Sequence, residues 1–225
     1  MRLLEKLFDH LTALKLVDSN PARGLAIKEP SKSGQHHDKT MWLTEEQQQA
    51  VVEKLPEGGW KAQRNRALIA TILGGGVKVS EVVALRVGAV GARQENGSLY
   101  LDVHPEGAGR QHRTKVSPFA AAYLTAWLKE RKAFGLQGDV LFPAKPIGGM
   151  LHTTTVYRHV AGLLTEAGIA PFIIKRRGAR TLRNTFAVRE LLNGQSIEAV
   201  GEFLGHHADR STLYYKALIK NESSK

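Results

Sequence analysis

The segment that decides how this chain folds and what it does is its last fifth, which reads RTLRNTFA at residues 180–187, LGHH at 204–207 and STLYY at 211–215. It holds two arginines three residues apart, then a histidine, and then a tyrosine nine residues after that histidine. Such side chains bind phosphate oxygens, move protons and attack phosphodiesters. A helical C-terminus with an ordinary cationic face explains each element alone but not their joint occurrence. The pattern therefore predicts a site for phosphodiester chemistry.

The composition of the 225 residues favours a globular protein with a polyanionic partner. The hydrophobic content of 42% is sufficient for a buried core. Lys and Arg number 32 against 21 Asp and Glu, and this net charge of +11 attracts polyanions such as nucleic acid. The absence of cysteine excludes a disulfide scaffold and a thiolate zinc site. No apolar run approaches the roughly 18 residues of a membrane span, and the N-terminus is too charged for a secretory signal, so we expect a cytoplasmic, nucleoid-associated protein.

The chain divides at a polar linker. Residues 3–17 repeat apolar positions at helical spacing, and Pro21 ends this helix because the residue before a proline is pushed out of the helical region. Residues 28–39 contain proline, glycine, serine and charged residues but almost no apolar ones, which is typical of a flexible connection. We place the domain boundary near Asp38.

The patterns beyond the linker predict a mainly helical domain with one small antiparallel β-hairpin. Thr44 begins a capping box, TEEQ, and should start a helix. Leu99, Leu101 and Val103 alternate with polar residues, as in a strand, and a turn leads to a basic second strand at 111–117. Further helices are predicted at 64–73, 79–86, 118–134, 153–167, 181–193, 196–204 and 210–220.

In these motifs and this order of elements, residues 38–220 resemble the tyrosine recombinase (phage integrase, Xer-like) family. The resemblance implies the fold of that family's catalytic domain for residues 38–225. It makes residues 1–37 the C-terminal helix remnant of a core-binding domain plus a linker. It also implies that a tyrosine attacks a DNA phosphate to form a 3′-phosphotyrosyl link, that arginines stabilise the developing charge, and that histidine and lysine assist proton transfer. No metal or other cofactor is implied.

The family's motifs imply roles for single residues. Its nucleophile stands nine residues after the histidine of a Leu-Gly-His motif, and counting from His206 reaches Tyr215. Tyr214 lies about 100° away around a helix and is interpreted as a packing residue. Arg183 occupies the second arginine position and is followed by Asn-Thr-Phe-Ala, as the motif expects. The alternative for Arg183 is an ordinary surface arginine.

Three positions depart from the family's motif. Lys78 stands where the family has its first catalytic arginine, and a lysine lacks the planar fork that binds two phosphate oxygens. Arg180 stands where a histidine or lysine is usual, and an arginine does not accept a proton near neutral pH. Ala108 occupies the hairpin turn that carries the family's lysine. Of the nearby cations Arg110 and Lys115, only Lys115 is able to give up a proton.

These departures leave two functions open. The first is a site-specific DNA recombinase or integrase whose catalysis is impaired, since losing one preorganised donor typically slows a reaction on the order of 10²- to 10³-fold. The second is a catalytically inactive, DNA-binding regulator or accessory protein of a mobile element or plasmid. We expect Lys78, Arg180, Arg183 and His206 to converge on one basic pocket, with Tyr215 within reach.

Two windows without acidic residues, 107–129 and 167–189, predict contacts with the phosphates of double-stranded DNA. The alternative for each window is a solvated cationic face. The adjacent histidines 206–207 face different directions on a helix, and no metal site is predicted. A second copy of this chain or a related recombinase is a further possible partner on DNA. The residues predicted to contact DNA are Arg110, Arg113, Lys115, Lys175, Arg176 and Arg177.

Overall fold

The computed structural model describes residues 2–21, 42–105, 109–169, 171–206, 212, 213 and 215, and it describes the backbone alone for residues 2–5 and 171–177. The chain forms two compact units, Met1–Lys39 and Thr40–Lys225. The predicted linker at 28–39, with its boundary near Asp38, lies outside the described residues. Among the helices that are described, none is long and apolar enough to cross a membrane.

The first unit contains helix α1 (Arg2–Ala13), which is shorter than the predicted range of 3–17. The reason is a local C-cap. Lys15 takes the left-handed conformation with φ of 55°. The amide of Leu16 then donates a hydrogen bond of 3.0 Å to the carbonyl of Leu11, which closes the last turn in the manner of a Schellman motif.

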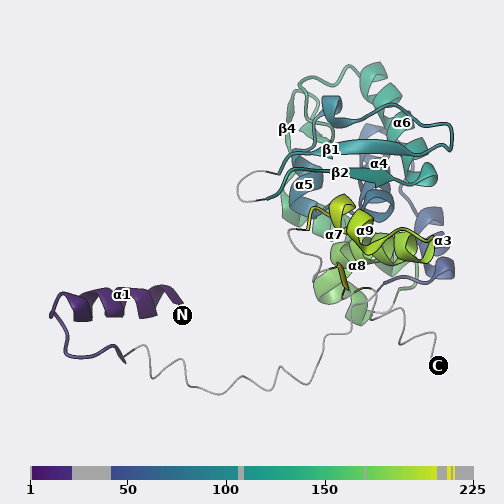
Figure 1. Cartoon of the computed structure of the whole chain (residues 1–225). Helices are drawn as coiled ribbons and strands as arrows, with labels where there is room; N and C mark the ends of the chain where they lie inside the picture. The colour runs from purple at the N-terminus through teal and green to yellow at the C-terminus, as the bar shows by residue number, and fades with distance from the viewer. Residues whose placement is uncertain are drawn as a thin grey trace. The chain divides into compact units, whose positions relative to one another are not determined.

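The second unit is mainly helical, as the sequence predicts, and its described residues form two small antiparallel hairpins where one was predicted (Figure 1). In chain order its elements are α3 (Glu45–Glu53), α4 (Trp60–Gly75), α5 (Val79–Ala84), the 3-10 turn η2 (Val87–Ala89), β1 (Leu99–Val103), β2 (His112–Val116), α6 (Pro118–Ala133), β3 (Pro143–Lys145), β4 (Gly148–Met150), α7 (Thr153–Glu166), α8 (Pro171–Leu192) and α9 (Ile197–Phe203). The capping box is confirmed, since the Thr44 side chain accepts from the amide of Gln47 and the Gln47 side chain accepts from the amide of Thr44.

Helix α4 forms the centre of this unit. Its residues from Ala67 to Gly75 are all buried, and a helix that is apolar on every side needs neighbours all round. It packs against α6, α8 and β2. The β1–β2 hairpin lies across α4, and α8 and α9 lie on one side of the hairpin (Figure 1). Arg183 and His206, from α8 and the end of α9, are thereby carried close to the turn that follows α4.

The predicted hairpin is confirmed in position, and the structure gives its register. Leu99, Leu101 and Val103 are buried, and they pair with Val116, Thr114 and His112 of β2. A second hairpin, β3–β4, was not expected. Its strands have three residues each, which is too short for an alternating pattern to be seen in the sequence.

Two helix boundaries differ from the prediction for reasons of packing. Helix α5 ends at Ala84 because the carbonyl of Leu85 accepts a hydrogen bond of 2.8 Å from Leu141 instead of continuing the helix. Helix α8 begins at Pro171, ten residues before the predicted start at 181. A proline suits the first turn of a helix. The predicted helix at 210–220 falls mostly outside the described residues, and those of its positions that are described, 212, 213 and 215, are helical.

A glycine substitution tests the turn after α4. Gly76 has φ of +66°, and a Cβ there would overlap the ring of Phe186. Gly135 has φ of +63°, with nothing within 4 Å of an added Cβ. We expect Gly135→Ala to lower the free energy of unfolding by about 1 kcal/mol through backbone strain alone. Gly76→Ala should lower the free energy of unfolding by about 1–3 kcal/mol more than Gly135→Ala does, because the added Cβ overpacks the core. Urea unfolding measures both, and equal losses would contradict the packing role of Gly76.

Candidate active site

A cavity of about 730 Å³ is lined by residues of α5, α7 and α8 together with His206 and Tyr215. The predicted convergence is confirmed, because the lining includes Lys78, Arg180, Arg183, His206 and Tyr215. Lys78 is the N-cap of α5, and the two arginines lie one turn apart on α8. Arg180 is exposed, whereas Arg183 and Tyr215 are buried. What these side chains do there remains a proposal.

Arg183 is held in place by the ends of two other helices. Its Nη1 donates a hydrogen bond of 2.6 Å to the carbonyl of Gly76, the C-cap of α4. Its Nη2 donates one of 2.7 Å to the carbonyl of Leu204, the C-cap of α9. Burial lowers the pKa of Arg183, and the nearby carboxylate of Glu81, at 3.6 Å, opposes that shift. The guanidinium is therefore fixed before any ligand arrives.

Glu81 is a buried carboxylate that orients Lys78. Its Oε1 accepts a hydrogen bond of 2.8 Å from Nζ of Lys78, and its Oε2 accepts one of 2.7 Å from the Lys78 amide. Burial alone would raise the pKa of Glu81, but the hydrogen bonds from Lys78 and the charges of Arg183 and Lys78 outweigh it and lower the pKa. The carboxylate is therefore ionised. The Lys78 side chain keeps 47% of its surface exposed.

His206 is neutral near pH 7. Burial lowers its pKa to about 4, and the positive charges of Arg183 and Lys78 act in the same direction. Its Nδ1 lies 2.9 Å from the hydroxyl of Thr212, a fully buried residue that fixes the ring. A neutral imidazole can accept a proton, whereas a protonated imidazole cannot.

Tyr215 lies beside His206 with its hydroxyl already engaged. The two rings are nearly parallel, with an interplanar angle of 3° and centroids 6.4 Å apart. The Tyr215 hydroxyl donates a hydrogen bond of 3.0 Å to Oδ1 of Asn184, the residue after Arg183. The phenol is thus held among the groups that line the cavity.

The β1–β2 hairpin is attached to the loop that carries His206. Arg110 donates a hydrogen bond of 2.9 Å to the carbonyl of His206. The His112 ring packs so closely on Gly205 that a Cβ there would overlap it. Arg113 is exposed, lies 3.3 Å from Asp102 and covers the ring of Tyr100. Ala108 lies outside the described residues, and so do the side chains of Lys175, Arg176 and Arg177 on α8.

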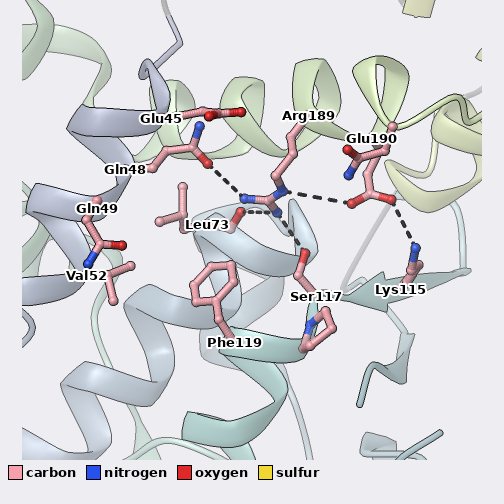
Figure 2. A pocket seen from close by; sticks show the side chains of 12 residues that line it. Glu45, Gln48, Gln49, Val52, Leu73, Lys115, Ser117, Phe119, Arg189 and Glu190 are labelled. Atoms are coloured by element: carbon pink, nitrogen blue, oxygen red, sulfur yellow. Dashed lines mark hydrogen bonds and ion pairs between the residues drawn. The ribbon is translucent and has the colours of Figure 1, made fainter. Parts of the chain in front are cut away.

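Lys115 points into a different cavity, of about 470 Å³, which Figure 2 shows. There it lies 3.3 Å from Glu190. Arg189 crosses the same cavity and donates hydrogen bonds to the side chains of Gln48 and Ser117, of 3.1 and 2.9 Å. These contacts tie α3 and α8 to the start of α6. Lys115 therefore lines a different cavity from Tyr215, and its role in place of the hairpin lysine stays a prediction.

Three further residues of the site were not found from the sequence: Glu81, Asn184 and Thr212. Glu81 had a signal, because it is a single carboxylate within the apolar run VSEVVAL. Asn184 belongs to the Asn-Thr-Phe-Ala motif, but neither it nor Thr212 had a signal for its contact, since the partners come from other segments. Within the described part of the chain, no group of three or more histidines and carboxylates could hold a metal ion.

Comparisons with known proteins show which family the chain resembles. Residues 41–222 match the phage integrase family. The chain is 27% identical over 216 residues to the tyrosine recombinase XerC of Serratia marcescens, covering 96% of this chain and 66% of that protein. It is 26% identical to XerC of Escherichia coli strain SMS-3-5, covering 67% of that protein. The chain thus spans about two thirds of the length of these relatives.

Solved structures show the same fold. XerA recombinase superposes with a TM-score of 0.66 at 22% identity, over 82% of this chain and 64% of that one. XerH recombinase, in a post-cleavage complex with a palindromic difH substrate, superposes with a TM-score of 0.68 at 23% identity. The match covers 82% of this chain and 51% of that one. A lambda integrase dimer bound to a core site superposes with a TM-score of 0.63 at 15% identity, and the match covers 94% of this chain and 56% of that one.

The protonation of His206 can be measured directly. We expect its ring to titrate with a pKa of about 4, against 6.5 for an unperturbed histidine. Between these pH values the unfolded chain binds more protons, so the folded state loses stability as the pH falls through that window. NMR of the ring nitrogens measures the pKa, and His206→Gln identifies the signal. Lys78→Met removes a positive charge and should raise the pKa. A natural-chain midpoint near 6.5 would contradict the burial of this ring.

Proposed function

The chain belongs to the phage integrase family, and from this membership we propose that it cuts and rejoins double-stranded DNA through a covalent 3′-phosphotyrosyl link to Tyr215. The observation that carries the proposal is the shared cavity of Tyr215, Arg183, His206 and Lys78. A nucleophile, cations and a neutral imidazole around one space are what phosphoryl transfer requires. The relatives named above as recombinases support the same reaction.

The cations prepare the cavity for the charge of the transition state. Arg183 is fixed by carbonyls and by Glu81, so little reorganisation is needed when a phosphate binds. Arg180 is exposed at the same cavity and can follow the DNA backbone. Lys78 supplies a point charge where a planar fork would bind two oxygens, and we therefore propose that cleavage is slow.

Attack requires that Tyr215 lose its proton. Asn184 accepts a hydrogen bond from the hydroxyl but is no base, so we propose that His206 takes the proton at Nε2. The pKa of His206 is low because burial and the charges of Arg183 and Lys78 disfavour its cation. A bound phosphate brings negative charge beside those groups and raises that pKa. The DNA itself would thus activate the base.

The remaining predicted contacts concern the DNA beyond the cut phosphate. We propose that Arg110 and Arg113 of the hairpin face flanking phosphates, together with Lys175, Arg176 and Arg177 of α8. Lys115 is the least favourable of the predicted DNA contacts, because its ammonium is already paired with the carboxylate of Glu190. Recombination needs strands from two duplexes, so we propose that two or more copies assemble on DNA. The crystal structure of a lambda integrase dimer bound to a core site supports assembly of more than one copy on DNA.

DNA binding should depend steeply on salt. Each phosphate contact adds about −0.9 to the slope of log affinity against log salt. Arg180→Ala should weaken binding and reduce the slope by about one contact, because Arg180 is an exposed cation at the cavity. Arg93, another exposed arginine, donates a hydrogen bond to Gly97 of its own loop and is the control. Fluorescence anisotropy over a salt series measures both, and a slope near zero would overturn the DNA proposal.

A covalent complex tests the chemistry. Duplexes enriched from a random library by binding to the Tyr215→Phe chain, then nicked so that the cleaved fragment diffuses away, should give a slow covalent band on a denaturing gel. The band should vanish with Tyr215→Phe and persist with Tyr157→Phe, another tyrosine that lines the cavity. Binding without a band would instead favour a DNA-binding regulator that has kept the fold.

A further inference from the structure

Cleavage of the phosphodiester has a requirement that Tyr215, Arg183 and His206 do not meet. The 5′-oxygen leaves the phosphorus as an alkoxide, which is a very strong base, and a proton delivered in the transition state lowers this barrier. The hairpin turn offers Ala108 for this task, which has no proton to give. We therefore look for a donor among the described residues that line the cavity.

Most of the candidates are excluded by their chemistry. Arg180 and Arg183 carry guanidinium groups, which do not give up a proton in proteins. His206 is already neutral and is needed on the side of the nucleophile. Among the described residues that line the cavity, Lys78 is the only primary amine. Tyr157 also carries a hydroxyl proton, but its residue is 54% exposed and it brings no positive charge to the developing alkoxide.

Arg183 holds apart the segments that carry Lys78 and His206. Arg183 uses one terminal nitrogen to hold Gly76, two residues before Lys78, and the other to hold Leu204, two residues before His206. The segments that carry Lys78 and His206 therefore lie at different edges of one guanidinium. Glu81 contacts both Nη1 of Arg183 and Nζ of Lys78, so we place the Lys78 ammonium on the Gly76 side of a phosphate bound at Arg183, and His206 on the Leu204 side. Attacking and leaving oxygens need this separation.

We propose that Lys78 is the catalytic acid that protonates the leaving 5′-oxygen, a role that rests on the proposed cleavage by Tyr215. In this step the bond between the Tyr215 oxygen and phosphorus forms and the bond from phosphorus to the 5′-oxygen breaks. The Tyr215 proton goes to His206, and a proton of Nζ goes to the 5′-oxygen. In rejoining, the neutral amine takes the proton of the attacking 5′-hydroxyl and His206 returns its proton to Tyr215.

Glu81 orients the ammonium for this exchange. Its Oε1 holds Nζ at 2.8 Å, so the ammonium stays aimed while the side chain remains 47% exposed to the cavity. After the proton has left, the neutral amine still donates a hydrogen bond to the same oxygen. Lysine at this position thus combines a charge for the phosphate with a transferable proton, which an arginine cannot supply.

The experiment compares two leaving groups in the full chain. The probe is the nicked duplex described above, made with oxygen or with sulfur at the 5′-bridging position. A thiolate is a far weaker base than an alkoxide and leaves without a proton. Lys78→Arg keeps the charge and removes the transferable proton. We expect it to slow cleavage about 10²-fold or more with oxygen and to stay within about threefold of the natural chain with sulfur.

Three controls separate the possible outcomes. Arg183→Lys should slow both substrates, Tyr157→Phe should slow neither, and thermal unfolding checks that each variant folds. Equal slowing of both substrates by Lys78→Arg, or faster cleavage with oxygen, overturns the acid role while cleavage by Tyr215 stands. A natural chain that cuts only the sulfur substrate also overturns it. No Tyr215-dependent band with either substrate overturns the cleavage proposal and this inference together.

Discussion

The buried guanidinium of Arg183 is the interaction on which the rest of the site depends. Removing a charged group from water costs several kcal/mol unless it is paired and hydrogen-bonded. Here Glu81 supplies the opposite charge, and the carbonyls that end α4 and α9 supply the hydrogen bonds. Those carbonyls belong to the turns that carry Lys78 and His206. One side chain therefore stabilises the packing of three helices and sets the spacing of the site.

Helix α8 places its arginines in quite different environments. Arg180 is exposed at the large cavity, Arg183 is buried beneath it, and Arg189 is enclosed by Gln48, Ser117 and aromatic rings in the second cavity. All belong to one stretch of sequence without acidic residues. A basic stretch of sequence can therefore contain arginines that support the fold as well as arginines that are free to meet a ligand. The direction in which each side chain points around the helix decides which of the two it is.

Much of the fold was predictable because local patterns and tertiary contacts agree. The alternation at Leu99 and Leu101, the capping box at Thr44 and the spacing between His206 and Tyr215 each correspond to a feature of the structure. What was missed depends on contacts between distant segments. Glu81 acquires its role from Arg183, about a hundred residues later in the chain, and no local pattern records such a pairing. The early start of α8 and the short β3–β4 hairpin were missed because their sequences carry weak periodicity.

The hydrogen bond from Tyr215 to Asn184 has a consequence for assembly. Asn184 follows Arg183 directly, so the tyrosine rests against the same helix whose arginine lines the cavity. Under the proposed function, each copy of the chain would therefore supply both the attacking tyrosine and the cations from one cavity. Under the proposed function, chemistry would be autonomous in every subunit. Partner subunits would then govern the timing and the choice of strand, not the composition of the catalytic centre.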